Sequence, residues 1–201
     1  MGDWFAAAVP GPHPLAMEQP AEDLSHGPVR LRRWRRADAD TVYRVVMDSL
    51  DHLRPWMPWA AGYDRERAAQ FVTLCEHDWP AGVAYNYAIV TGDGEVVGSI
   101  GLMRRVGPGG LEIGYWLHPA HTGRGFATAA SAALVEQAFT LPGVEFVEIV
   151  HDEANTASGA IPSRLGFAQV ERRHRAQEAG APAETGVDLV WRLTREQAAA
   201  R

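Results

Sequence analysis

Lysine is absent from this chain, and all 19 of its basic residues are arginine. Without a lysine amine there is no Schiff base for pyridoxal phosphate and no lysine-dependent aldol chemistry. The glycine-rich loop of P-loop NTPases ends in a lysine followed by Ser or Thr, so that nucleotide site is excluded as well. An anionic ligand would therefore have to be held by backbone amides or by arginine.

Cysteine is almost absent too, which limits disulfide and metal chemistry. The single residue Cys75 permits no internal disulfide and no Cys-rich zinc site. The histidines at 118, 121 and 151 do not have a zinc-ligand spacing, so we expect no metal.

Long apolar runs are also missing. No stretch approaches the ~18 residues needed to span a bilayer, and the N-terminus lacks the basic segment of a secretory signal. We expect a cytoplasmic protein without a membrane partner. The net charge of -6 argues against nucleic-acid binding. The arginines within residues 30–36 would alternate between the two faces of a strand, which favours a solvated surface over a basic patch.

The length of 201 residues predicts one domain. Residues 1–27 are rich in Pro, Ala and Gly and are expected to form a flexible extension. The domain itself is expected over residues 28–195, with a short tail over 196–201.

Hydrophobic periodicity predicts both helices and strands. Helices are expected from Asp38 or Asp40 to about residue 53, and over residues 65–78, 126–139 and 156–164. Strands are expected over residues 29–34, 84–91, 95–103, 111–117, 144–150, 167–173 and 187–193. Because a helix joins the strands at 111–117 and 144–150, that pair should be parallel within a mixed, otherwise antiparallel sheet. The predicted fold class is therefore α/β, and more specifically α+β, with helices packed against a mixed, mostly antiparallel sheet.

A glycine-rich loop at residues 122–128, with the sequence TGRGFAT, is the most informative segment. Two glycines allow a tight turn, and the loop leads directly into a helix. The free N–H groups and positive dipole of a helix N-terminus attract phosphate. Alone, this pattern also fits an ordinary strand-to-helix loop.

Further segments support a ligand site when they are taken in order. They are GSIGL at 98–102, EIGYWL at 112–117, GRGFAT at 123–128, NTAS at 155–158 and LGF at 165–167. In this order the chain resembles the GNAT superfamily of N-acetyltransferases, and most closely its RimJ/RimL-like branch of ribosomal-protein alanine acetyltransferases. The resemblance covers about residues 29–194.

The resemblance implies a six- to seven-stranded sheet flanked by about four helices. The strands at 111–117 and 144–150 would splay apart and hold acetyl-CoA or another acyl-CoA. The implied reaction is direct transfer of the acyl group to a primary amine, either a protein N-terminus or a small amine. A non-catalytic acyl-CoA-binding or regulatory module is the alternative, and a homodimer is also implied.

The resemblance further implies which residues bind the co-substrate. The pyrophosphate would lie on the loop amides, and a main-chain N–H near Leu117 would stabilise the oxyanion. Asn155 would cap its helix, bind the pantetheine amide, or do both. The whole implied set is Leu117, Gly123, Arg124, Gly125, Phe126, Ala127, Thr128 and Asn155. Thr122 departs from the Gln or Arg that the family has at the first loop position.

Catalytic candidates combine the resemblance with ordinary acid–base chemistry. Glu112 is the first candidate base because it shares a strand face with Trp116, and His151 is the second. A water relay to either group remains open. By the resemblance, Ser158 is expected to orient the thiol by a hydrogen bond or to protonate the departing thiolate. Trp56 and Trp59 are expected in the acceptor pocket, either as an apolar wall or as packing of a hydrophobic loop.

Overall fold

The computed structural model describes residues 18–175 and 180–200, and its centre is one mixed sheet. The eight strands found there lie in the order β1-β2-β3-β4-β5-β6-β8-β7. All neighbours are antiparallel except β5 and β6. The strands are β1 (Asp23–His26), β2 (Val29–Arg33), β3 (Ala84–Thr91), β4 (Val96–Met103), β5 (Gly110–Leu117), β6 (Phe146–Asp152), β7 (Ala168–His174) and β8 (Val187–Thr194).

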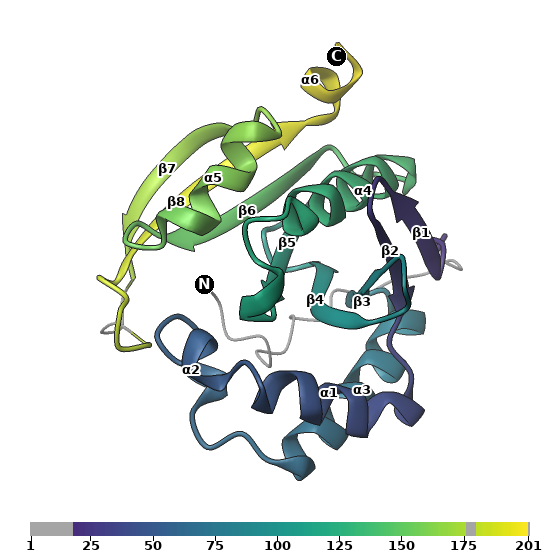
Figure 1. Ribbon diagram of the computed structural model, residues 1–201. Coiled ribbons are helices and arrows are strands. Elements are labelled where there is room, and N and C mark those ends of the chain that lie inside the picture. Colours follow the sequence, from purple (N-terminus) through teal and green to yellow (C-terminus); the bar gives the residue numbers. More distant parts are fainter. Residues whose placement is uncertain (1–17, 176–179, 201) are drawn as a thin grey trace.

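Helices cover both faces of this sheet. Figure 1 shows α1 and α3 on one side of the central strands and α4 on the other. The α-helices of the described part are α1 (Ala39–Met47), α2 (Leu50–Leu53), α3 (Arg65–Ala81), α4 (Phe126–Thr140), α5 (Thr156–Arg164) and α6 (Arg195–Ala199). Three short 3₁₀ helices are η1 (Arg36–Asp38), η2 (Pro58–Ala60) and η3 (Pro119–His121). The predicted mixed sheet is confirmed, with more strands and helices than expected.

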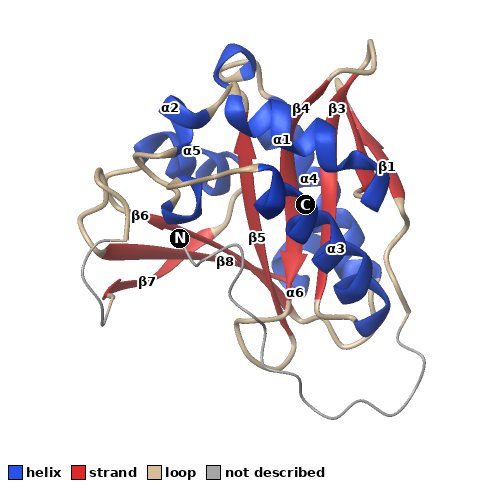
Figure 2. Cartoon of the chain, turned by 90° about the horizontal axis from the view of Figure 1, so that it is seen from below, coloured by secondary structure: helices blue, strands red, loops and turns tan. Residues whose placement is uncertain are grey.

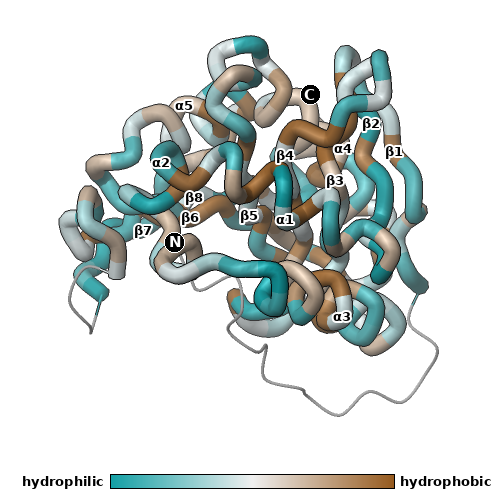
Figure 3. The backbone as a smooth tube through the Cα atoms, turned by 60° about the horizontal axis from the view of Figure 1, so that its bottom comes forward, coloured by the Kyte–Doolittle hydropathy of each residue, from teal (hydrophilic) through white to brown (hydrophobic). Residues whose placement is uncertain are grey.

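Two hydrophobic cores follow from the alternation of side chains along the strands. Tyr87 and Ile89 of β3 pack in the core beneath α4, together with Leu134 of that helix. Their neighbours Ala88 and Val90 point the other way and pack in the core that contains α1 and α3. Figure 3 shows the hydrophobic residues concentrated along the central strands. Burial on both faces explains why β3, β4 and β5 are almost entirely apolar.

The parallel pair β5–β6 is short, and this opens the sheet. Only the residues at 110–112 of β5 pair with those at 146–148 of β6. Beyond that point β6 continues on β8, whereas β5 continues only on β4. Figure 2 shows β6, β7 and β8 crossing away from β5. The predicted splay between these strands is therefore present, and its vertex lies at Glu112 and Glu148.

The structure corrects some of the predicted boundaries. Strand β1 lies inside the segment 1–27 that was expected to be a flexible extension, and it pairs with β2 through Leu24 and Leu31. Residues 1–17 of that segment lie outside the described residues. The helix expected up to residue 53 is broken between α1 and α2, where the Ser49 hydroxyl donates to the Val45 carbonyl at 2.6 Å. Helix α6 occupies most of the expected tail.

Candidate functional site

A cleft of about 950 Å³ opens where β5 and β6 diverge. Its walls come from segments far apart in the sequence, which the splayed sheet brings together. They are the β1–β2 turn at 26–28, residues 52–53 and 56–57 around α2, residues 115–117 of β5, most of the glycine loop and first turns of α4 at 122–132, and residues 154–165 around α5. The cleft is therefore large enough for an extended ligand.

The glycine loop shapes one rim of the cleft. Gly123 and Gly125 have φ angles of 71° and 79°, in the left-handed region that favours glycine. A Cβ atom at either position would meet nothing within 4 Å, so the space beside the loop is open. Helix α4 begins at Phe126 and its first N–H groups have no helical partner. This rim offers backbone N–H groups to an anion, and the anion site itself stays a prediction.

Leu117 presents its backbone to the opening. The His118 N–H donates to the Val97 carbonyl of β4 at 2.7 Å. Because N–H groups alternate between the two edges of a strand, the N–H groups of Leu117 and Tyr115 point away from β4 and into the gap. Both residues line the cleft, and β6 is no longer paired there.

Ser158 and Asn155 meet at the start of α5, as predicted. The Asn155 Oδ1 accepts from the Ser158 N–H at 3.1 Å and so caps the helix. The Ser158 side chain lines the cleft. The sequence reasoning missed Tyr115, whose hydroxyl oxygen lies 3.0 Å from both the carbonyl oxygen and the Oγ of Ser158.

Glu112 does not line the cleft. Its carboxylate is buried at the closed end of the splay and receives two hydrogen bonds from Arg105, at 3.0 Å and 2.5 Å. Glu148 lies opposite it in the strand register, and one of its carboxylate oxygens accepts two hydrogen bonds from Arg192. The predicted face of Glu112 agrees with the structure, but its depth along the strand does not suit a base.

His151 does not line the cleft either. Its Nδ1 lies 2.8 Å from the Asp152 carbonyl oxygen, and its Nε2 accepts from Trp191 Nε1 at 3.0 Å. Since a carbonyl only accepts, the proton is assigned to Nδ1 and neither nitrogen is left for catalysis. Burial lowers the pKa of this imidazole from its usual 6.5. The ring packs against Gly159 of α5, where a Cβ would lie only 2.7 Å from it.

The two tryptophans predicted for the acceptor pocket have different places. Trp56 is half-buried and lines the cleft beside Leu53 and Met57. Trp59 does not reach the cleft, and its ring packs against Trp116 with centroids 6.2 Å apart. Trp59 therefore supports the wall from behind.

Comparison with known proteins now identifies the family. A family model described as an acetyltransferase (GNAT) domain matches residues 29–168. The chain belongs to this family. The prediction of a GNAT-superfamily N-acetyltransferase is thereby confirmed.

Individual relatives point to one branch of the GNAT family. The "Putative ribosomal N-acetyltransferase YdaF" of Bacillus subtilis (strain 168) is 28% identical over 144 residues, which are 69% of this chain and 77% of that protein. The structure of Mycobacterium smegmatis RimJ in complex with CoA-disulfide is 27% identical, with a TM-score of 0.73 and 87% coverage of both chains. A coenzyme A complex of RimL, the ribosomal L7/L12 alpha-N-protein acetyltransferase, shares the fold, with a TM-score of 0.77 at 18% identity over 88% of this chain and 99% of that one. These matches confirm the resemblance to the RimJ/RimL-like branch.

The cleft of this GNAT domain contains residues that sequence reasoning did not select. Tyr115 shares a strand face with Leu117, so the period of two would have found it. Arg164 lines the cleft from the last turn of α5. The predicted Arg124 does not line it, because its guanidinium lies over the Phe126 ring, 4.8 Å from the centroid.

His52 is another cleft residue that sequence reasoning did not select. It is exposed, and no hydrogen bond or ion pair to its ring is found in the described part of the chain. Although the residue is exposed at its surface, partial desolvation of the ring by the surrounding cleft, and then the charge of His118, lower its pKa from the usual 6.5. No sequence signal marked His52, because only the packing of α2 beside the end of β5 gives it a role.

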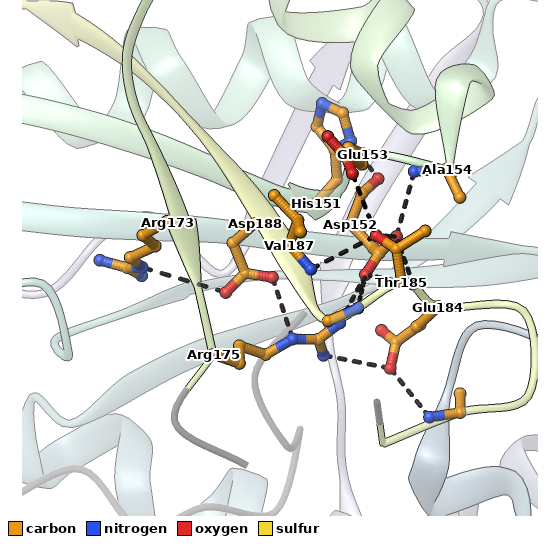
Figure 4. Close-up of polar contacts among 12 residues, drawn as sticks. His151, Asp152, Glu153, Ala154, Arg173, Arg175, Glu184, Thr185, Val187 and Asp188 are labelled. Atoms are coloured by element: carbon orange, nitrogen blue, oxygen red, sulfur yellow. Dashed lines mark hydrogen bonds and ion pairs between the residues drawn. The ribbon is translucent and has the colours of Figure 1, made fainter. Parts of the chain in front are cut away.

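The wall around Trp56 is supported by a polar cluster at the end of β6 (Figure 4). The Asp152 carboxylate accepts from the N–H groups of Ala154, Thr185 and Gly186 at 2.9–3.0 Å. The Arg175 guanidinium also donates to it at 2.6 Å. Burial works to raise the pKa of this carboxyl, but the hydrogen bonds outweigh burial and hold the pKa at about 2.

This cluster fixes residues 180–186 against the cleft wall that contains Trp56. The Ala183 N–H donates to the Pro55 carbonyl at 3.0 Å, and a Cβ on Gly180 would lie 3.0 Å from Pro58. Arg175 also binds the Glu184 carboxylate at 3.1 Å. Residues 180–186 thus rest on the segment that carries Trp56. Residues 176–179, part of the loop expected at 176–186, lie outside the described residues.

Neither a metal site nor a membrane span appears in the described ranges. Across residues 18–175 and 180–200, no group of three or more His, Cys, Asp or Glu side chains is arranged to hold a metal ion. No helix in the same ranges has the length and apolar character to cross a bilayer.

The Asp152 cluster predicts a pH-dependent stability. Asp152→Asn keeps the side-chain size but loses the charge, so we expect the free energy of unfolding at pH 7 to fall by about 1–3 kcal/mol, the range for hydrogen bonds to charged groups. Because the folded pKa of about 2 lies below the usual 3.8, this stabilisation is complete above about pH 4 and is lost as the pH falls towards 2. Urea unfolding between pH 2 and pH 7 measures it.

The matched control is Asp48→Asn, at an exposed position after α1. It should unfold as the wild type does across the whole pH range. Hydrogen exchange at the Thr185 and Gly186 amides should rise only in the Asp152 variant. An Asp152→Asn protein with unchanged acid unfolding would contradict the role given to this carboxylate.

Proposed function

We propose that this chain is an acyl-CoA-dependent N-acyltransferase, with acetyl-CoA as donor and a primary amine as acceptor. One observation carries the proposal: the unpaired edge of β5 meets the glycine loop and Ser158 in a single cleft. That arrangement offers an anion site, free strand amides and a hydroxyl along one path. An acyl-CoA has a pyrophosphate, a pantetheine chain and a thioester in the same order along its length.

The residues present fit coenzyme A. The open space beside Gly123 and Gly125 lets a pyrophosphate approach the first amides of α4. The N–H groups of Leu117 and Tyr115 point into the gap, where a pantetheine chain could pair as an added strand does. Ala127 and Thr128 complete this side of the cleft. Arg164 lines the cleft beside Leu165, and its guanidinium is the proposed side-chain ligand for a phosphate of CoA.

Arg164 gives the first functional prediction. Arg164→Gln should weaken CoA binding about tenfold at low salt and less at high salt, because an exposed charge-assisted contact is screened. Because the α4 amides would hold the pyrophosphate, we assign the 3′-phosphate of CoA to Arg164. Binding of 3′-dephospho-CoA should therefore change little in this variant. Isothermal titration with both ligands measures this.

The control is Arg124→Gln, an exposed arginine of the same loop region that does not line the cleft. It should bind both ligands as the wild type does. If Arg124→Gln lost CoA affinity and Arg164→Gln kept it, the assignment would be reversed.

The chemistry begins with an uncharged amine at the thioester carbonyl. A primary α-amine has a pKa of about 7.7–8.0, so a base must take its proton for attack at neutral pH. The developing oxyanion would be stabilised by the Leu117 N–H that points into the gap. The C–S bond then breaks, and the sulfur leaves beside Ser158.

His52 is the base that the cleft supports best. Its ring lies at the acceptor end with Trp56, near the end of β5 that carries Leu117. The lowered pKa keeps the imidazole neutral at pH 7 and able to accept a proton. Glu112 and His151, the bases expected from the sequence, are bound by Arg105 and Trp191 and lie outside the cleft lining.

The base assignment predicts a change in the pH profile. His52→Gln should lower kcat at saturating amine about 10²-fold, the lower range for general-base catalysis, and leave CoA binding intact. In the wild type, kcat should fall as the pH drops through the His52 pKa, below 6.5, and this limb should vanish in the variant. Added imidazole should restore part of the rate to His52→Ala.

His77→Gln is the matched control, because His77 is exposed on α3 and paired with Asp78 at 2.9 Å. Its kcat and pH profile should equal those of the wild type. A His52→Gln enzyme with the wild-type rate and pH profile would remove His52 from the mechanism.

The acceptor would enter past Trp56, Leu53 and Met57, which form an apolar wall. Two relatives are named for ribosomal-protein acetylation, and this supports a protein N-terminus as the acceptor. A small amine is the rival acceptor. An apolar wall without a fixed anion suits the first residues of a peptide better than a polyamine.

A panel of amines tests the proposed function. The wild-type protein is incubated with acetyl-CoA and short peptides beginning with Ala, Ser or Met, or with spermidine, and release of free thiol is followed. We expect turnover with at least one peptide and slower turnover with spermidine. Binding of CoA without thiol release from any amine would instead favour a non-catalytic binding module.

A further inference from the structure

Helix α5 contains a proline that breaks its hydrogen-bond ladder. Pro162 lies in the interior of the helix and has no N–H. In a regular helix that N–H would bind the carbonyl four residues earlier, which is the carbonyl of Ser158. The backbone oxygen of the proposed thiol-orienting residue therefore lacks its helical donor.

Tyr115 supplies the missing donor from β5. Its hydroxyl oxygen lies 3.0 Å from the Ser158 carbonyl oxygen and 3.0 Å from Ser158 Oγ. A carbonyl can only accept, so with the tyrosine hydrogen on the carbonyl the Ser158 hydroxyl donates back to the Tyr115 oxygen. Both side chains are buried and line the cleft. The Tyr115 hydroxyl, rather than solvent, thus fixes the orientation of the Ser158 hydroxyl.

From this geometry we infer that Tyr115 is a positioning residue that aims the Ser158 hydroxyl at the departing sulfur. Because Pro162 leaves the Ser158 carbonyl without its helical donor, Tyr115 caps that carbonyl as well. The inference rests on the proposed function and deepens it. It assigns to a strand residue the task of supporting the leaving group, which the sequence had placed on the helix alone.

The pair has two hydrogen-bond arrangements. With the tyrosine hydrogen on the carbonyl, the lone pairs of Ser158 Oγ are free to accept from a thiol. With the tyrosine hydrogen on Oγ, the serine hydrogen is free to donate to a thiolate. The change from one arrangement to the other rotates the two hydroxyl groups about their C–O bonds and breaks no covalent bond. Burial raises the Tyr115 pKa above its usual value, against an opposing hydrogen bond from Ser158, so the phenol stays protonated as a donor.

The rest of α5 is fixed so that this alignment is kept. The Asn155 side chain holds the Ser158 N–H at 3.1 Å. One residue further on, Gly159 sits against the His151 ring with no room for a Cβ. The His151 ring is itself held by Trp191. The helix therefore cannot turn about its axis without breaking these contacts.

A double-mutant cycle at Tyr115 and Pro162 separates positioning from stability. Tyr115→Phe should lower kcat about tenfold, the effect of one hydrogen bond in the transition state, and leave the KM for acetyl-CoA unchanged. It should also lower Tm, because the Ser158 carbonyl becomes unpaired. Pro162→Ala restores an N–H for that carbonyl and should keep the wild-type kcat.

The double variant Tyr115→Phe, Pro162→Ala decides between the two roles. We expect it to recover the Tm lost in Tyr115→Phe while kcat stays low, because the helix regains its ladder but Ser158 Oγ still has no partner. Recovery of both Tm and kcat would reduce Tyr115 to a structural residue and overturn the inference. Wild-type kcat in Tyr115→Phe would overturn it as well.

The assay uses acetyl-CoA and the fastest amine of the panel, so failure of the proposed function is seen separately. A wild-type protein that binds CoA and releases no thiol overturns the proposed function and with it the catalytic part of this inference. Turnover in the wild type with equal turnover in Tyr115→Phe overturns the inference alone.

Discussion

The cleft depends on where the pairing of β5 and β6 stops. Glu112 and Glu148 face each other at the last paired position, and like charges directly opposite would destabilise the sheet. Arg105 and Arg192 neutralise them from the neighbouring segments. Removing either arginine's charge would leave a buried carboxylate unpaired, which is costly. These two ion pairs hold the vertex closed while the strands separate beyond it.

Everything placed in the cleft follows from that separation. The N–H groups of Leu117 and Tyr115 are free for a ligand because β6 has already turned towards β8. The gap also admits α5, the helix that follows β6, and Ser158 of this helix contacts Tyr115 of β5. On the opposite face, Trp116 lines the cleft, and Trp59 packs behind it. A single change of strand direction thus separates the two sides that the proposed function gives to donor and acceptor.

Much of this could be predicted from sequence, because the strands at 84–117 have turn glycines and the loop at 122–128 leads into a helix. Strand β1 could not, since it has four residues and only Leu24 packs on the core. Glu112 has the strand face that the sequence predicts, but it lies at the vertex of the splay and outside the cleft lining. A period of two gives the face of a strand residue, whereas its distance from the cleft depends on where pairing ends, which is a tertiary property.

The absence of lysine has its clearest consequence in the buried ion pairs. Guanidinium binds a carboxylate through two parallel hydrogen bonds, as Arg105 does with Glu112, and a lysine would offer one point charge. Arg175 similarly contacts three carboxylates from one planar group, those of Asp152, Glu184 and Asp188. Both clusters lie beside the cleft rather than in it. Arginine therefore builds the frame, whereas the described residues line the cleft with backbone amides, hydroxyls, the imidazoles of His26 and His52, and a single guanidinium, that of Arg164.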